Sequence, residues 1–477
     1  MSSVAVSIAL QIPFILIGLG IILLIWPYSF RSNLILKIVL GVGLGAGFSS
    51  LLFFLWLLIL PNYLNFYLIF EIIILLILLL CLINLRKREK PESPDQFNWK
   101  KQHWYGWGIL SIFILSTALW IFSYRSVTFM SPHGTFDAYA IWNLRARFIV
   151  RGGENWQTGL SPDLNWKNHP DYPMLTPALV ARSWSFLDNE TTRVPIVLSA
   201  IFTLGMVGMV FATLLETRGL TTASIGGIVL LSTSWVQFFP TTQNADTPLA
   251  FYYLACCSLI YLYYRDPKKQ FLFLAGFMAG FAAWTKNEGI VFLLATFGCI
   301  LLVQWFNSKK LKKSLKSLCP YLLGLILPTI IILVFKTQLA TDNDMSNNLT
   351  INLAWAQIID GGRYGIIGKE FLRLFYSVEI LDISFVVWIL VFLFILGKKD
   401  QNIVGNRILM SVVVLTLFGY FSIYLITPHP LAWHLNYSAD RLLYHLLPLI
   451  WLITCLNTRS IETKELQLEQ VENNNNW

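Results

Sequence analysis

The carboxylate of Asp137 lies in an aromatic and basic stretch that follows directly on an apolar run. The stretch reads SPHGTFDAYAIWNLRARFIVRGGENW over residues 131–156. Phe136, Tyr139 and Trp142 would shield this carboxylate partly from water, a setting that favours a general base. We therefore expect Asp137 to be a catalytic base. The alternative is a solvated loop aspartate or a helix cap.

Several cations are candidates for binding a phosphate. Arg145 is one, because a guanidinium pairs with phosphate oxygens; the alternative is ordinary anchoring at the membrane surface. Lys286 and Glu288 stand between two apolar runs with almost no loop, where charges are costly unless they are paired or used. Lys286 is therefore expected either to bind phosphate or to form an ion pair. Arg441 is expected at the N-terminus of the last apolar helix, where a bound anion would offset the unfavourable helix dipole.

Other residues are expected to shape a sugar or acceptor pocket. They include Tyr172, which lies in the stiff turn HPDYP at 169–173, and Asp246, which opens an apolar run and could also cap its helix. The full set expected for this pocket is Tyr139, Trp142, Tyr172, Asp246, Glu288 and His434. No histidine or cysteine spacing defines a metal site, so no cofactor is required, although a divalent metal stays open.

The composition predicts a membrane protein. The chain has 477 residues, of which 56% are hydrophobic and 13% charged, whereas soluble domains have about 25% charged residues. Its mean hydropathy is +0.61. Because the backbone must satisfy its own hydrogen bonds in lipid, we expect an all-α bundle. The net charge of +9 collects in short loops and does not indicate a nucleic-acid partner.

The apolar runs predict about thirteen transmembrane helices. They cover residues 5–26, 34–60, 64–85, 105–124, 193–216, 220–239, 246–264, 270–285, 288–306, 318–336, 380–397, 406–426 and 441–456. The basic connections at 86–101, 265–269, 309–316 and 398–407 then all fall on one side, which is the cytoplasmic one by the positive-inside rule. The N-terminus is expected outside and the C-terminus inside.

The runs group into three parts. Residues 1–104 are expected to form an accessory module of three spans with a basic linker, in which GVGLGAG at 41–47 is a small-residue packing face. Residues 105–456 form the main module, whose large outer loops at about 125–192 and 337–379 contain amphipathic helices. Residues 457–477 are expected to be a disordered cytoplasmic tail.

Four segments of the main module resemble the GT-C superfamily of polytopic glycosyltransferases, the class of protein mannosyltransferases and aminoarabinose lipid A transferases. These segments are FDAYAIWNLRAR, QNADTPLAFYYL, GFAAWTKNEGIVF and SADRLLYHLLP. The resemblance implies a GT-C-type bundle, a polyprenyl-phosphate sugar donor and inversion at the anomeric carbon, with Asp137 at the position of the catalytic acid in the first outer loop. The chain departs from the mannosyltransferases in having Phe136 and Ala138, not a second acid, beside Asp137.

The sequence thus predicts an inverting glycosyltransferase of a bacterial cytoplasmic membrane, with its site facing outside. A glycan, a lipid or a protein could be the acceptor. A transporter or flippase for lipid-linked saccharides is the main alternative, but it would place polar residues near the middle of several spans. A polysaccharide ligase or polymerase is another alternative, and that class would use arginines and histidines in a late outer loop.

Overall fold

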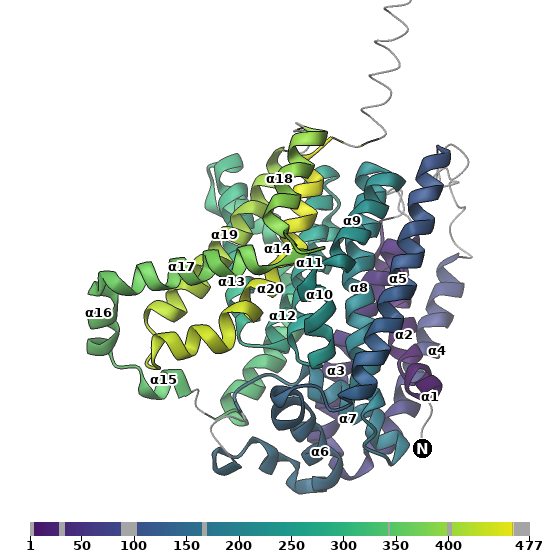
Figure 1. Cartoon of the computed structure of the whole chain (residues 1–477). Helices are drawn as coiled ribbons and strands as arrows, with labels where there is room; N and C mark the ends of the chain where they lie inside the picture. Colours follow the sequence, from purple (N-terminus) through teal and green to yellow (C-terminus); the bar gives the residue numbers. More distant parts are fainter. Residues whose placement is uncertain are drawn as a thin grey trace, which may run out of the picture.

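The computed structural model describes residues 4–27, 34–86, 103–164, 169–341, 344–397, 403–459 and 461. The linker expected after residue 86 and most of the tail expected after residue 457 lie outside these ranges. Helices make up nearly all of the described chain (Figure 1). The longer helices are α2 (Ile12–Ile25), α3 (Leu34–Ile59), α4 (Tyr67–Arg86), α5 (Trp104–Met130), α6 (Asn143–Gly152), α7 (Leu175–Leu187), α8 (Arg193–Arg218), α9 (Leu220–Ser232), α11 (Asp246–Arg265), α12 (Lys269–Thr285), α13 (Glu288–Ser308), α14 (Leu311–Gln338), α17 (Gly361–Ser377), α18 (Phe385–Leu396), α19 (Ile403–Leu425) and α20 (Leu431–Asn457).

Short elements connect these helices. They are α1 (Val4–Ala9), η1 (Pro61–Phe66), η3 (Ala138–Trp142), η4 (Gly153–Leu160), η5 (Pro162–Leu164), α10 (Ser234–Phe238), η7 (Phe239–Thr242), α15 (Asp344–Asn348), α16 (Ile351–Ile359), β1 (Glu379–Ile380) and β2 (Ile383–Ser384). β1 and β2 form an antiparallel hairpin, with Glu379 opposite Ser384. The all-α membrane fold expected from the sequence is confirmed.

Nine helices in the described ranges are long and apolar enough to cross a membrane, and a tenth is added if the bent pair at 220–242 counts as one span. Each of the other three expected spans coincides with a helix, namely α11, α12 or α18. Of these, α12 has 17 residues and α18 has 12. The two large loops expected from the sequence contain α6 and α7 in the first case and α15, α16 and α17 in the second. In Figure 1, α6, α7 and α15 lie toward the lower end of the bundle.

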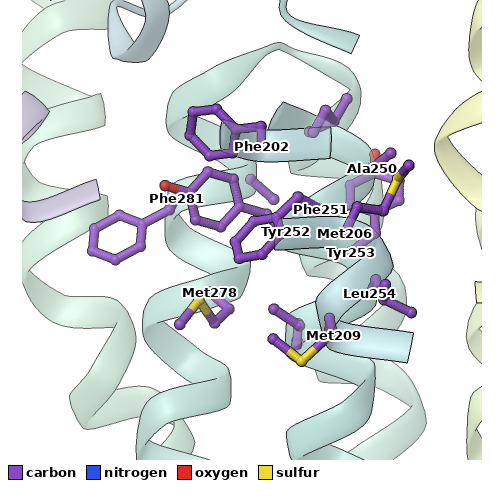
Figure 2. Close-up of a cluster of buried hydrophobic side chains, with 14 of the residues drawn as sticks. Phe202, Met206, Met209, Ala250, Phe251, Tyr252, Tyr253, Leu254, Met278 and Phe281 are labelled. Carbon is purple, nitrogen blue, oxygen red and sulfur yellow. The ribbon is translucent and has the colours of Figure 1, made fainter. Parts of the chain in front are cut away.

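The core of the bundle surrounds α11, in which every residue from Asp246 to Leu262 is buried. Figure 2 shows part of this core, where side chains of α8, α11 and α12 meet. Phe251 and Tyr252 of α11 both contact Phe202 of α8, with ring centres 5.7 and 5.9 Å apart, and Tyr252 also contacts Phe281 of α12. This packing holds the N-terminal end of α11 in a fixed position.

The N-terminal helices pack directly on the rest of the bundle. An added Cβ at Gly45 of α3 would lie 1.9 Å from the carbonyl oxygen of Phe14 in α2, and one at Gly47 would lie 2.4 Å from the Phe281 ring. The close approach of these helices depends on the missing side chains. The small-residue packing face expected at 41–47 is confirmed.

A buried ion pair joins the N-terminal helices to the large connection between α5 and α8. Glu71 of α4 and Arg182 of α7 form the pair, and each side chain is 1% exposed. Nε of Arg182 donates to both carboxylate oxygens of Glu71, at 2.9 and 2.8 Å. Because α7 follows the segment that carries Tyr172, this pair helps to fix the position of that segment.

We expect Arg182→Met to lower the free energy of unfolding by about 3–5 kcal/mol, because it leaves the Glu71 charge buried without its partner. The double variant Glu71→Met with Arg182→Met should recover most of this loss, since neither charge remains. Unfolding by SDS in mixed micelles measures both effects. Arg151→Met is the control, because the Arg151 side chain is 68% exposed and its pair with Glu190 lies at the surface, where ion pairs contribute little to stability. A fully stable Arg182→Met variant would contradict the prediction.

Candidate active site

Asp246 is the centre of a buried cluster of charged side chains. Its Oδ1 accepts hydrogen bonds from Nζ of Lys286 and Nε2 of His445, both at 2.8 Å. Its Oδ2 accepts from Nε of Arg441 at 2.9 Å. The side chains of Asp246, Lys286 and His445 are at most 2% exposed. Charges buried to this extent persist only when they are paired, and the ion pair considered for Lys286 is present.

Two helix ends bring this cluster together. Asp246 is the first residue of α11, and Lys286 lies in the break between α12 and α13, with extended backbone (φ −153°, ψ 160°). The capping role considered as an alternative for Asp246 is not observed: Ala245 is the N-cap residue, and no side-chain capping bond is present there. The carboxylate instead faces the cations, and its charge near a helix N-terminus is favoured by the helix dipole.

Arg441 links the buried cluster to Asp137. Its Nη1 donates to Oδ2 of Asp137 at 2.5 Å, and the two side chains are 19% and 23% exposed. The expected place of Arg441 at a helix N-terminus is wrong, because α20 begins at Leu431, about three turns earlier. The two carboxylates of Asp137 and Asp246, and not the helix dipole, account for this arginine.

The chain around Asp137 is tied to the loop before α11. Asp137 directly precedes η3, a π-helical turn in which the N–H of Asn143 bonds to the carbonyl of Ala138; such turns are frequent at functional sites. The N–H of Thr135 donates to the carbonyl oxygen of Thr242 at 3.3 Å. Gly134 has φ of +69°, and a Cβ there would lie 2.5 Å from the same oxygen. A side chain at 134 would therefore push Asp137 away from Asp246.

A small apolar cluster completes this support. Ile141, Trp142 and Ala245 form it, and Tyr172 packs against them. The rings of Trp142 and Tyr172 are stacked with centres 5.6 Å apart. Nζ of Lys286 lies 5.8 Å from the centre of the Tyr172 ring, within the range of a cation–π contact. Burial raises the pKa of the Tyr172 phenol well above its usual range, with Glu288 adding to the effect, so Tyr172 stays neutral.

Arg145 supports the HPDYP turn. Its side chain is 1% exposed, Nη1 donates to the carbonyl of Tyr172 at 2.7 Å, and Nη2 donates to that of His169. Burial lowers the pKa of its guanidinium to about 10, an effect partly opposed by Asp171, so it remains a cation at neutral pH. These contacts direct Arg145 to the backbone of the HPDYP turn, and its phosphate binding stays a prediction. Its neighbour Arg147 pairs with Glu190 at 3.2 Å.

A second polar cluster lies next to the first. Nδ2 of Asn287 donates to Oδ2 of Asp171 at 2.5 Å, and Nζ of Lys336 donates to Oδ1 of Asn287 at 2.7 Å. Sequence reasoning gave no role to Asn287, Lys336 or His445, and it considered Asp171 only as part of the HPDYP turn. The available signal for His445 was its place four residues after Arg441 inside an apolar run, because residues at i and i+4 share a helix face.

The remaining expected residues lie at the edge of the cluster or beyond it. Oε1 of Glu288 is 3.0 Å from Nζ of Lys286, whereas its Oε2 is buried and has no hydrogen-bond partner in the described part of the chain. Tyr139 is 45% exposed. Nδ1 of His434 lies 2.9 Å from the hydroxyl of Thr427. His434 precedes Arg441 by seven residues and therefore lies on a similar face of α20.

No group of three or more histidine, cysteine, aspartate or glutamate residues within the described ranges is placed to hold a metal ion. All six cysteines are free. The polar side chains of the cluster are carboxylates, a lysine, an arginine and a histidine.

The fold and the site define a polytopic helical membrane protein with a charged cluster at broken helix ends. Residues 169–334 match the family model described as dolichyl-phosphate-mannose-protein mannosyltransferase. This third of the chain includes Asp246, Lys286 and Glu288, but it ends before Arg441 and begins after Asp137. The match supports the resemblance to GT-C enzymes and indicates a membrane glycosyltransferase of that type with a lipid-linked sugar donor. No curated protein and no solved structure matches the chain.

Proposed function

We propose that this protein is an inverting glycosyltransferase in which Asp137 is the general base and Arg441 and Lys286 bind the phosphate of a polyprenyl-phosphate sugar. The observation that carries this proposal is the Asp137–Arg441 contact of 2.5 Å. It places a partly exposed carboxylate beside a partly exposed guanidinium, from two parts of the chain that are 304 residues apart. A base and a phosphate-binding cation are the two groups that a single displacement at a sugar phosphate needs.

The reaction follows from these two groups. The carboxylate of Asp137 takes the proton of an acceptor hydroxyl while the hydroxyl oxygen attacks the anomeric carbon. The bond between that carbon and the phosphate oxygen breaks, and polyprenyl phosphate leaves with the electron pair. Arg441 and Lys286 stabilise the charge that develops on the leaving phosphate. One displacement on the face opposite the leaving group inverts the anomeric centre.

The sugar and the acceptor would lie between Asp137 and Glu288. The unpaired, buried Oε2 of Glu288 is a hydrogen-bond acceptor that a sugar hydroxyl can satisfy. The exposed ring of Tyr139 gives an apolar surface at the rim. A glycan, a lipid or a protein with a free hydroxyl fits this chemistry as the acceptor.

We propose that the site faces the outside of a bacterial cytoplasmic membrane, with the N-terminus outside and the C-terminus inside. The support is the charge pattern: the lysine-rich segment 309–316 and the basic segment 265–269 both lie at helix ends away from the breaks that carry Asp246 and Lys286. Positively charged loops remain on the cytoplasmic side.

The direct test uses the purified full-length protein in detergent with a panel of polyprenyl-phosphate sugars and acceptor extracts. We expect release of polyprenyl phosphate and a product whose anomeric configuration, read by NMR, is opposite to that of the donor. We expect turnover to persist in EDTA if Arg441 and Lys286 alone stabilise the leaving phosphate, whereas loss of turnover in EDTA would add a divalent metal to the site. Retained configuration would contradict a single displacement. Movement of the intact lipid-linked sugar from one leaflet of a proteoliposome membrane to the other, without release of polyprenyl phosphate, would favour a transporter.

A further inference from the structure

The guanidinium of Arg441 divides its donors between two carboxylates in different settings. Nε bonds to Asp246, whose side chain is 1% exposed, and Nη1 bonds to Asp137, whose side chain is 23% exposed. One end of this fork is thus fixed in the interior, and the other end reaches the rim of the site.

The two carboxylates also differ in their other partners. Asp246 accepts hydrogen bonds from Lys286 and His445 as well, so it remains neutralised whatever Nη1 of Arg441 contacts. For Asp137, Arg441 is the one ion-pair partner within the described residues. The guanidinium thus occupies Oδ2 of Asp137, at 2.5 Å from Nη1, while no ion pair involves Oδ1 among the described residues.

We propose that Arg441 is an exchange residue, whose Nη1 pairs with Asp137 in the donor-free enzyme and moves to the phosphate when the lipid-linked donor binds. The Nε bond to Asp246 keeps the guanidinium in place during this exchange. The exchange frees Oδ2 of Asp137, and moves the guanidinium away from the base, only after a donor phosphate is present. This inference rests on the proposed function and adds an order to it: the donor binds first, and the base is freed second.

The exchange has an unusual consequence for binding. Asp137→Asn should bind polyprenyl phosphate about tenfold more tightly than the wild type, because the phosphate no longer competes with a carboxylate for Nη1; a tenfold change corresponds to about 1.4 kcal/mol. The measurement is calorimetry or intrinsic tryptophan fluorescence of the full-length protein in detergent with a short-chain polyprenyl phosphate. The uncharged polyprenol of the same length should bind both proteins equally.

Asp440→Asn is the matched control. Asp440 lies next to Arg441, but its Oδ1 accepts from the backbone N–H of Arg441 and not from the guanidinium. Its replacement should therefore leave the affinity within about twofold. In the background of Arg441→Gln, the additional change Asp137→Asn should no longer tighten binding, because the shared cation is missing.

The outcomes separate this inference from the proposed function. Unchanged or weaker binding by Asp137→Asn, in a protein that elutes as a single species, would overturn the exchange even if transfer is lost and Asp137 is the base. Tighter binding together with normal transfer would support the exchange and overturn Asp137 as the base. Unchanged binding by Arg441→Gln would remove Arg441 from the phosphate site and overturn the exchange.

Discussion

Asp137→Asn is expected to lower the turnover of sugar transfer by about 10³-fold, within the range that a general base contributes. The amide has the shape of the carboxylate but cannot accept the proton of the acceptor hydroxyl. Its carbonyl oxygen can still accept a hydrogen bond from Nη1 of Arg441, so the fold should be retained. The measurement is the initial rate of polyprenyl phosphate release at saturating donor and acceptor, with thermal unfolding in detergent as the check on folding.

A second aspartate in the connection between α5 and α8 provides the control for this change. Asp163 lies in the exposed turn η5 and is hydrogen-bonded to Ser161 at 3.2 Å, away from the ion pairs of the site. Asp163→Asn should transfer sugar at a rate within about twofold of the wild type, as expected for a surface change. A folded Asp137→Asn variant with the wild-type rate would make Asp137 a structural partner of Arg441. The base would then have to be Asp246 or Glu288.

The sequence is sufficient to predict the long helices, because an apolar run of about 20 residues is typical of a membrane-spanning helix. It is less reliable at the polar ends of helices. The segment LAWHLNYSADR reads as a loop by hydropathy, yet residues 431–441 form the first turns of α20. Their mixed polarity suits a helix that is partly buried and partly exposed. Composition alone predicts such a helix only weakly. The error moved Arg441 from the start of a helix to its interior.

The types of residue at the site can also be predicted from the sequence, whereas the ion pairs that they form cannot. Charged residues at the edges of apolar runs are costly, and this identifies Asp246, Lys286 and Glu288 as residues with partners or functions. Which cation meets which carboxylate depends on the packing of α11, α12 and α20, which no local pattern describes. Arg145 shows the same limit, since an arginine on an amphipathic helix can face a phosphate or backbone carbonyls, and spacing does not distinguish the two.

Asp246→Asn should have the largest effect on stability of any single change at the site. It leaves Lys286 and the Nε end of Arg441 without the buried carboxylate that now neutralises them, and it removes the charged partner of His445. Loss of one partner from a buried ion pair costs about 3–5 kcal/mol. The free energy of unfolding, measured by SDS in mixed micelles, should fall by about this amount, and turnover should be lost with it because both phosphate-binding cations are displaced.

A double variant tests whether this loss arises from the cations that Asp246 neutralises. Without Asp246, and among the described residues, Lys286 keeps only its ion pair with Glu288, and Arg441 keeps only its ion pair with Asp137. Lys286→Met removes one of the buried cations, so Asp246→Asn with Lys286→Met should be more stable than the sum of the single changes predicts, by about 1–3 kcal/mol. Strictly additive losses would mean that Asp246 and Lys286 do not stabilise each other despite their 2.8 Å contact. The contrast with Asp137 is the sharper test. Asp137 and Asp246 share Arg441 as a partner. Replacement of the partly exposed Asp137 should lower turnover and leave the stability of the protein unchanged, whereas replacement of the buried Asp246 should lower both.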